Sequence, residues 1–209
     1  MSIDTLDNDT TRLEQLWARD FGNAYVERNR EAWVDRGPFW QDVAQRYPFA
    51  SALEIGCNVG GNLKWLAGCD RQIDLTGIDV NGQALEELRS KLPQVTTLQT
   101  PGRDLPFADG SFGLTFTMGV LIHVSPESLS DVMSEIVRCS KRFVLCGEYF
   151  AEQTVEVPYR GHEGALYKRN FGQLYAEQFP ELSLLETGFL PKGEGFDDVT
   201  FWIFEKDQG

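Results

Sequence analysis

The chain has 209 residues, a formal net charge of -13 and a hydrophobic fraction of 42%, which is ordinary for a globular protein. This length allows one well-buried domain and is short for two. Binding to a nucleic-acid backbone depends on clustered cations, so the acidic balance disfavours a nucleic-acid partner. No apolar run approaches the ~20 residues of a membrane-spanning helix, which disfavours a membrane partner.

The N-terminal segment and the cysteines bear on localisation. The stretch MSIDTLDNDTTR is polar and acidic, unlike a secretory signal or an Arg-rich transit peptide. Cys57, Cys69, Cys139 and Cys146 show neither CxxC spacing nor a His at zinc-ligand spacing. We therefore expect buried free thiols, no metal site and a cytoplasmic protein.

The N-terminal quarter of the chain has a helical pattern. Its first dozen residues are polar and without periodicity, and we expect them to be disordered. Apolar residues then recur at three- and four-residue steps, which predicts a helix from Thr11. These residues are Leu13, Leu16, Trp17, Phe21 and Tyr25. A second helical segment is expected over residues 30–46, bent or split at Gly37-Pro38.

From residue 49 onward, strand and helix patterns alternate. Strands are expected at residues 50–56, 74–80, 96–100, 112–120, 141–149, 182–190 and 199–206. Helices are expected at residues 61–68, 81–92, 126–140 and 171–179, the second of them capped by Asn81. This alternation predicts an α/β fold with a seven-stranded, mostly parallel sheet, helices on both faces and a final antiparallel hairpin. We divide the chain into a helical extension or lid, residues 1–48, and a main domain, residues 49–209.

The stretch LEIGCNVGGN, residues 53–62, ends a predicted strand with an acid and three glycines. Glycine costs backbone entropy, so the cluster indicates positive φ angles or a ligand close to the backbone. In open α/β sheets, ligands bind at the carboxyl ends of strands. The spacing does not give the G-x-G-x-x-G pattern of dinucleotide-binding folds, which makes an NAD-dependent dehydrogenase the least favoured enzyme. A turn without a ligand is the ordinary alternative.

The turn resembles the E/D-x-G-x-G-x-G pattern of class I S-adenosylmethionine (SAM) methyltransferases, with Asn58 in place of the middle glycine. Asn readily adopts left-handed backbone conformations, so this exchange is mild. The resemblance implies a Rossmann-like methyltransferase with SAM as cofactor and S-adenosylhomocysteine (SAH) as product. It also implies that Glu54, Gly56, Asn58, Gly60 and Asn62 hold the amino-acid end of SAM.

Two further segments extend the resemblance. Asp79 ends the second predicted strand, where a carboxylate can accept hydrogen bonds from both hydroxyls of a ribose, with Val80 beside it. A helix cap without a ligand is the alternative for Asp79. The segment GRDLPFADGSF resembles the adenine-binding segment of these enzymes. It implies that Asp104 accepts from the adenine amine and that Leu105 packs on the ring, although a plain turn has the same composition.

The end of the fourth predicted strand, TMGVLIHV, matches the part of the family that lies beside the methionine of SAM. The resemblance implies cofactor contacts from Met118, Gly119 and Val120. His123 falls where an acid/base group is often found, whereas a lone His in an apolar run is more often structural. An O or N acceptor must lose a proton, and a nearby base assists this step. His123 is the first candidate, followed by Tyr149 and His162.

Two segments outside the predicted sheet mix aromatic, basic and amide side chains. In the first, Tyr25, Arg28 and Asn29 have helical spacing and could clamp the SAM carboxylate or close the pocket. Leu13, Leu16 and Trp33 fit a plain core stripe instead.

The second segment is an acceptor loop at about residues 149–170. Its basic and aromatic residues are Tyr159, Arg160, His162, Tyr167, Lys168 and Arg169. Arg forms bidentate contacts with carboxylate or phosphate, so we expect the loop to bind an anionic small-molecule acceptor. A mobile loop that balances local Glu residues is the alternative.

Together, four motifs resemble the methylases associated with pseudaminic acid biosynthesis, from about Leu13 to the C-terminus. They are W-x-x-x-F-G-x-x-Y-x-x-R-N, E-I-G-x-N-x-G-x-N, M-G-V-L-I-H-V and P-Y-R-G-H-E-G…K-R-N-F. Asn170 departs from the expected acid in K-R-D-F. The resemblance implies methyl transfer to an O or N atom of a sugar acid or nucleotide sugar.

Other functions stay open at this point. The same basic loop could hold an amino acid or a peptide-like metabolite for N- or carboxyl-methylation. A SAM-binding module without catalysis is a third possibility. Exposed aromatic residues in the N-terminal helices fit a lid or a dimer interface equally well, so both a monomer and a homodimer are compatible with the sequence.

Overall fold

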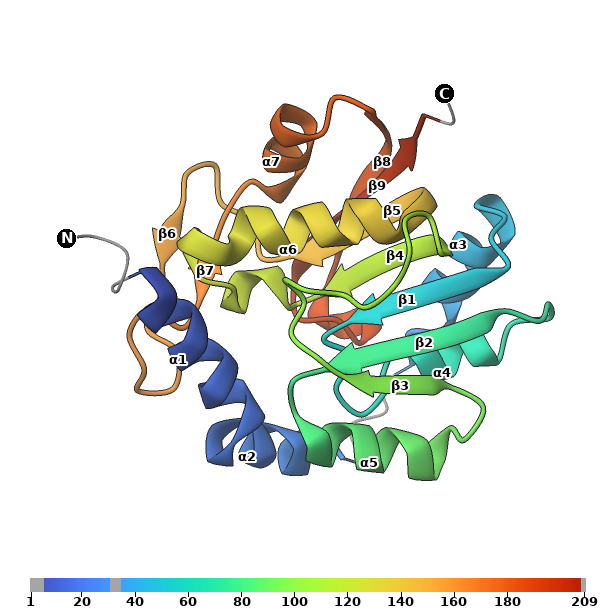
Figure 1. Ribbon diagram of the computed structural model, residues 1–209. Coiled ribbons are helices and arrows are strands. Elements are labelled where there is room, and N and C mark those ends of the chain that lie inside the picture. Colours follow the sequence, from blue (N-terminus) through green and yellow to red (C-terminus); the bar gives the residue numbers. More distant parts are fainter. Residues whose placement is uncertain (1–5, 31–34, 208–209) are drawn as a thin grey trace.

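The computed structural model describes residues 6–30 and 35–207 (Figure 1). The helices are α1 (Leu6–Ala18), α2 (Asp20–Asn29), α3 (Gly37–Arg46), α4 (Leu63–Ala67), α5 (Gly82–Lys91), α6 (Pro126–Cys139) and α7 (Phe171–Gln178), with 3-10 turns η1 (Leu121–His123) and η2 (Lys192–Glu194). The strands are β1 (Ser51–Ile55), β2 (Asp74–Asp79), β3 (Thr96–Gln99), β4 (Phe112–Met118), β5 (Ser140–Glu148), β6 (Val155–Glu156), β7 (Tyr167–Lys168), β8 (Leu182–Leu190) and β9 (Val199–Lys206). Every strand and helix expected beyond residue 48 is present.

The main sheet has seven strands in the order β3-β2-β1-β4-β5-β9-β8. β1 pairs in parallel with both β2 and β4, and β9 runs antiparallel to both β5 and β8. The predicted fold class is therefore confirmed. Strand order reverses between β1 and β4, and in open α/β sheets this reversal creates a crevice at the carboxyl ends of the strands.

Helices cover both faces of the sheet and bury an apolar layer on each (Figure 1). α3, α4 and α5 pack on one face, where Trp40 is fully buried and its ring lies 4.7 Å from that of Phe116. α6 and α7 pack on the other face, around Ile136 and Phe171. Each such side chain contributes about 1.5–3 kcal/mol when buried, so the sheet is a stable base for the loops at its carboxyl edge.

The N-terminal helices differ from the prediction in two respects. The expected disorder of the first dozen residues is wrong for residues 6–12, because α1 begins at Leu6. Tertiary contacts explain this helix. The Thr10 hydroxyl lies 3.0 Å from that of Ser125, and Leu13 is 3% exposed. The predicted helix through Tyr25 is also interrupted, since α1 ends at Ala18 and α2 begins at Asp20.

A tight corner separates α1 from α2. A Cβ atom at Gly22 would lie 1.7 Å from the carbonyl oxygen of Trp17, so only glycine fits there. Asn81 holds the corner from the main domain, because its Nδ2 donates to the Trp17 carbonyl and to Asn23 Oδ1, both at 2.9 Å. Trp33 and residues 31–34 lie outside the described residues. α3 begins at Gly37 with Pro38 in its first turn, where the missing N–H has no intrahelical partner to lose.

The acceptor loop contains a small antiparallel pair, β6 and β7, that the sequence did not predict. Each strand has two residues, which is too short for a periodic pattern to appear. In Figure 1 this pair lies beside α1 at the carboxyl edge of the sheet. Two segments distant in sequence therefore meet at one edge.

The cysteines are free thiols, with Cys57, Cys139 and Cys146 buried and Cys69 half-buried. Within residues 6–30 and 35–207, no group of three or more His, Cys, Asp or Glu side chains could hold a metal ion. In the same part of the chain, no helix combines the length and apolar character needed to cross a membrane. The cytoplasmic location stays a prediction.

Candidate functional site

A cavity of about 530 Å³ lies at the carboxyl ends of β1, β2 and β4, where the strand order reverses. Its volume is in the range of about 300–1,000 Å³ that is typical of small-molecule sites. The turns after these strands form its floor. α1 and α2 cover it, together with the tip of the acceptor loop and the loop between β8 and β9.

Most of the residues predicted from the sequence line this cavity. They are Tyr25, Arg28, Asn29, Glu54, Gly56, Asn58, Asn62, Asp79, Val80, Met118, Gly119, Val120, His123, Tyr149, Tyr159 and Arg160. The others lie outside its lining, namely Gly60, Asp104, Leu105, His162, Tyr167, Lys168 and Arg169. The structure thus gathers the strand-end residues and separates part of the acceptor loop from them.

The glycine-rich turn has the left-handed backbone that its composition predicts. The φ angles are +71° at Gly56, +46° at Asn58 and +83° at Gly60. A Cβ at Gly56 would lie 2.5 Å from the Val120 side chain, so glycine lets this turn approach the β4 end closely. A Cβ at Gly60 would lie 2.4 Å from Leu88, so Gly60 serves packing on α5 and not the cavity.

Glu54 is a buried acid with one unsatisfied oxygen. It is 2% exposed, and its Oε1 accepts a 2.6 Å hydrogen bond from Asn62 Nδ2. Asn62 Oδ1 in turn accepts from Arg36 at 2.8 Å and from the Trp40 indole at 3.3 Å. Glu54 Oε2 is buried without a hydrogen-bond partner. Burial raises the pKa of Glu54 to about 8, so its ionised form at neutral pH requires a cationic donor beside it.

Asp79 joins the floor turns to each other. Its Oδ2 accepts the backbone N–H of Asn58 at 2.8 Å, and its Oδ1 accepts that of Asn81 at 2.9 Å. Burial is the main cause that raises the pKa of Asp79, and these backbone bonds oppose it. A carboxylate has about four acceptor positions, so acceptor capacity remains for a ligand in the cavity. Asn81 caps α5 as predicted, because its Oδ1 accepts from the Ala84 N–H at 2.9 Å.

The segment after β3 differs from the adenine-binding interpretation. Asp104 is exposed, and its backbone carbonyl accepts from the Thr100 hydroxyl at 3.2 Å. Leu105 is 3% exposed and belongs to the apolar layer under α6. Neither residue lines the cavity, whereas Thr100 and Gly102 of the same segment do.

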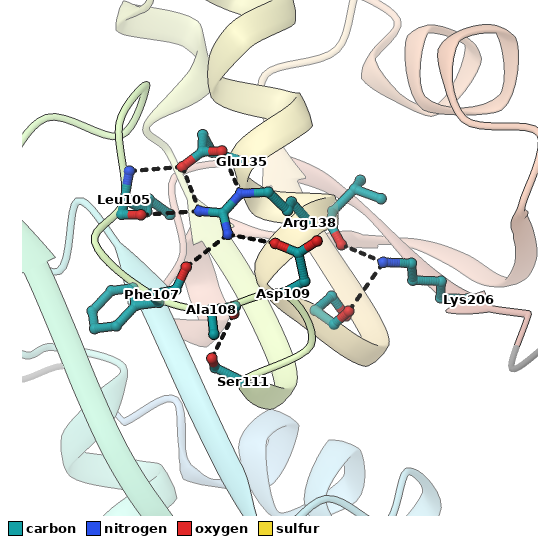
Figure 2. Close-up of polar contacts among 10 residues, drawn as sticks. Leu105, Phe107, Ala108, Asp109, Ser111, Glu135, Arg138 and Lys206 are labelled. Carbon is teal, nitrogen blue, oxygen red and sulfur yellow. Dashed lines mark hydrogen bonds and ion pairs between the residues drawn. The ribbon is translucent and has the colours of Figure 1, made fainter.

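Figure 2 shows why Leu105 faces the core. The Leu105 N–H donates to Glu135 at 2.7 Å, and its carbonyl accepts from Arg138 at 2.9 Å. Arg138 also donates to the Phe107 carbonyl at 2.7 Å and to Asp109 at 2.8 Å. We name these contacts of Arg138 the Arg138 buttress. It ties residues 105–109 to α6 through long-range contacts that the local sequence does not reveal.

His123 is held in one tautomer. Its Nδ1 lies 2.6 Å from the Ala165 carbonyl oxygen, and since a carbonyl only accepts, Nδ1 carries the ring proton. Nε2 is then the unprotonated nitrogen. Burial lowers the pKa of His123 to about 4, although the Ala165 bond opposes this shift. The ring packs against Trp17 at 4.5 Å and Tyr159 at 4.9 Å between centroids. At neutral pH it is a neutral hydrogen-bond acceptor.

Two phenols of the cavity stay protonated at neutral pH. Burial raises the pKa of Tyr25 to about 12, and the charges of Tyr159 and Asp197 reinforce this shift. Burial, followed by Asp197, also raises the pKa of Tyr149 far above its usual range. Both side chains are therefore hydrogen-bonding groups, and Tyr149 is poorly suited to act as a base.

Arg160 occupies the tip of a two-residue turn at the cavity. Tyr159 and His162 exchange backbone hydrogen bonds of 2.9 and 3.0 Å across the turn. The φ angles are +50° at Arg160 and +85° at Gly161, as in a type I′ turn. Holding Arg in this conformation costs energy that Gly or Asn would avoid, and such positions cluster at functional sites. His162 packs against Phe21, with 5.0 Å between ring centroids, outside the cavity lining.

The end of the acceptor loop lies behind the cavity wall. Arg169 is 2% exposed and donates to the carbonyls of Leu121 and Val124, both at 3.1 Å. Its guanidinium also lies 4.5 Å from the Tyr167 ring centroid, and the Lys168 amine lies 5.7 Å from that of Tyr149. The predicted acceptor contacts of these three loop residues do not agree with their positions, because backbone and aromatic groups of the wall already occupy them.

Sequence reasoning did not identify three charged residues of the cavity, Glu14, Arg36 and Asp197. Arg36 donates to the Gly195 carbonyl at 2.8 Å and lies 4.9 Å from the Phe196 ring centroid. It also donates to Asn62, as described above. Arg36 and Asp197 belong to no periodic pattern or motif. The one available signal was the position of Arg36 just before the Gly-Pro helix start.

Comparison with known sequences finds a similarity to methyltransferases over part of the chain. Residues 52–142 match the family model described as a methyltransferase domain. Over 94 residues the chain is 30% identical to the uncharacterized methyltransferase sll0829 of Synechocystis sp.. The matched part is 45% of this chain and 43% of that relative, so less than half of the relative's length is matched.

Solved structures of methyltransferases share the fold. Magnesium protoporphyrin IX methyltransferase (ChlM) from Synechocystis PCC 6803, with bound SAH, is 14% identical with a TM-score of 0.68, over 95% of this chain and 100% of that one. The 1,6-didemethyltoxoflavin-N1-methyltransferase of Burkholderia thailandensis, with bound 1,6-didemethyltoxoflavin and SAH, is 13% identical with a TM-score of 0.66, over 88% and 82%. The chain therefore has the Rossmann-like fold of SAM-dependent methyltransferases, and its methyltransferase-domain match spans the strands that form the cavity floor.

Proposed function

We propose that this protein is a SAM-dependent methyltransferase. Its acceptor is an O or N atom of a small anionic metabolite, a sugar acid or nucleotide sugar of the pseudaminic acid type. The unsatisfied Oε2 of buried Glu54 carries the proposal, because it lies in the same cavity as Asp79 at the ends of neighbouring parallel strands. The methyltransferase-domain match over the same residues supports it.

The residues present fit the cofactor. A cationic ammonium would satisfy Glu54 Oε2, which otherwise has no partner. The remaining acceptor capacity of Asp79 suits the two hydroxyls of a ribose. The left-handed turn through Gly56 and Asn58 brings backbone to the same edge of the cavity. When bound, SAM supplies a methyl group already activated on a sulfonium, so positioning and exclusion of water provide most of the acceleration.

The chain's own residues complete the acceptor side. His123 accepts the acceptor proton at Nε2, because its other ring nitrogen is engaged with Ala165. Tyr25 and Tyr149 remain protonated and orient the acceptor by hydrogen bonds. α1 and α2, which belong to the N-terminal segment of residues 1–48, act as the lid over this region.

Charge favours an anionic acceptor. Arg28, Arg36 and Arg160 line the cavity, while Glu54 and Asp79 serve the cofactor. Glu14 and Asp197 are the remaining acids of the lining, so three cations face two acids on the acceptor side. The sugar-acid class rests on the sequence motifs, and an amino acid or peptide-like metabolite would use the same cations. A SAM-binding module without catalysis would not need the base at His123.

The first experiment combines calorimetry with transfer from labelled SAM. We expect SAM and SAH to bind and NAD not to bind. Label should pass to a nonulosonic acid, its nucleotide-activated form or a nucleotide sugar in a mixed panel that also contains free amino acids. If label appeared only in amino acids, the proposed acceptor would change to an amino acid or a peptide-like metabolite. Tight SAM binding without transfer to any acceptor would support the binding module.

Arg160→Asn should raise the KM for the anionic acceptor about 10- to 100-fold, since a charged hydrogen bond contributes roughly 1.5–3 kcal/mol. Asn accepts the left-handed turn more readily than Arg, so the thermal stability should hold and SAM affinity should not change. Arg160→Lys keeps the charge and should recover part of the affinity. An unchanged acceptor KM in the Asn variant, measured by steady-state kinetics, would remove Arg160 from the acceptor site.

A further inference from the structure

Two buried charged side chains lie just outside the cavity and contact the turn that carries His123. Glu148, at the end of β5, is 0% exposed, and Arg169, after β7, is 2% exposed. Burying a charge is costly unless hydrogen bonds compensate for the lost water. Hydrogen bonds to the backbone around η1 provide this compensation.

Glu148 binds the start of η1. Its Oε1 accepts the backbone N–H groups of Val120 and Leu121, both at 3.1 Å, and its Oε2 accepts that of Ile122 at 3.3 Å. The first N–H groups of a helical turn have no partner within the turn. A carboxylate that accepts three of them fixes the direction in which the chain leaves β4.

Arg169 binds the other end of the same turn. Its Nη1 donates to the Leu121 carbonyl and its Nη2 to the Val124 carbonyl, both at 3.1 Å. The planar fork of Arg spans both carbonyls, which the compact ammonium of Lys cannot do in the same way. Ala165, four residues earlier in the same loop, accepts from His123 Nδ1. The loop therefore sets both the turn and the His123 tautomer.

Burial shifts the pKa of both groups toward the neutral form, and the hydrogen bonds and charges around them oppose this. Burial raises the pKa of Glu148 to about 7, while the N–H groups of Leu121 and Val120 oppose the shift. Burial also lowers the pKa of Arg169 to about 10, and the charges of Tyr167 and Glu148 oppose that shift. Arg169 thus stays cationic at neutral pH, with a carboxyl group on the opposite side of η1.

We propose that Glu148 and Arg169 are positioning residues that hold η1 from both ends, so that His123 presents Nε2 to the acceptor. The inference rests on the proposed role of His123 as the base. Neither side chain lines the cavity, so they act through His123 and the β4 end. Their loss should lower kcat and leave the KM for SAM and the acceptor nearly unchanged.

The test uses Glu148→Gln, Arg169→Met and Arg169→Lys in the full chain. Gln keeps the shape of Glu but turns an N–H donor toward one of the three backbone N–H groups. Arg138→Met is the matched control, because Arg138 on α6 also binds backbone carbonyls, those of Leu105 and Phe107, without touching η1. It should lower the thermal stability and leave kcat and the His123 tautomer unchanged.

Two readouts separate positioning from general stability. In protein labelled with ¹⁵N-histidine, NMR should report the Nδ1–H tautomer for His123 in the wild type. The chain has two His residues, so His123→Asn assigns the signal. Glu148→Gln and Arg169→Met should give a mixture of tautomers and a kcat lowered roughly 10- to 100-fold, within the contribution of a general base. Arg169→Lys should recover part of both.

An unchanged His123 tautomer in both variants would overturn the proposal, whatever the activity. The proposal would also fail if kcat fell together with thermal stability in Glu148→Gln, in Arg169→Met and in the Arg138→Met control. The pair would then only support the fold. The NMR readout does not depend on turnover. If the wild type transfers no methyl group, the proposed function fails while the tautomer still decides whether the pair orients His123.

Discussion

Replacing His123 with Asn is expected to lower kcat by about 10²- to 10⁴-fold, which is the usual contribution of a general base. The Asn amide can still donate to the Ala165 carbonyl, as Nδ1 does at 2.6 Å, but it offers no basic nitrogen. Because SAM binds through other residues, its affinity should not change. Steady-state kinetics and calorimetry on the same preparations measure both quantities.

The pH profile gives the matching control. Burial lowers the pKa of His123 to about 4, so the free base is present throughout the neutral range. The His123 ring should therefore contribute no inflection near pH 6.5, and its protonation should lower the rate only as the pH approaches about 4. A kcat of His123→Asn within a few-fold of the wild type would exclude this ring as the base. An inflection near pH 6.5 that is present in the wild type and absent from His123→Asn would show that the ring titrates at its usual pKa.

Glu54→Gln is expected to lower SAM affinity about 10- to 100-fold, since a charged hydrogen bond contributes roughly 1.5–3 kcal/mol. The amide keeps the bond from Asn62 but places an N–H group where the ammonium requires an acceptor. Calorimetry with SAM measures the loss. A variant that binds SAM as tightly as the wild type would show that Oε2 does not face the cofactor.

The same substitution should change how stability depends on pH. Burial raises the pKa of Glu54 from 4.5 to about 8, so the folded protein binds more protons than the unfolded chain between these values. The contribution of Glu54 to the free energy of unfolding therefore falls as the pH rises from about 4.5 to about 8 and is constant above that. Glu54→Gln removes this fall. Urea titrations at pH 5 and pH 8.5 should show a smaller loss for the variant, whereas SAM should stabilise the wild type more.

The strands and the floor of the site followed from local patterns. Runs of apolar residues with Gly, Asn and Asp at their ends predict strands and turns, because backbone conformation depends mainly on neighbouring residues. The carboxyl ends of parallel strands meet at one edge, which is why Glu54 and Asp79 could be placed in one site before any coordinates. Asn58 adopts the left-handed conformation expected of it.

Other features depended on contacts between distant segments. α1 begins earlier than its periodicity indicates because Thr10 meets Ser125, which is 115 positions away. Leu105 faces the core because Arg138 and Glu135 hold its backbone. No local pattern encodes such contacts, since they arise only once the sheet brings the segments together.

The acceptor loop shows most clearly which features the sequence determines and which depend on the tertiary structure. The sequence by itself determined that this loop concentrates cations and aromatic rings in an acidic chain. Only the tertiary structure decided that Arg160 reaches the cavity while Arg169 is buried behind it. The physical reason is that a guanidinium can bind a ligand or backbone carbonyls with the same geometry. Which of these it does depends on what the fold places within its reach.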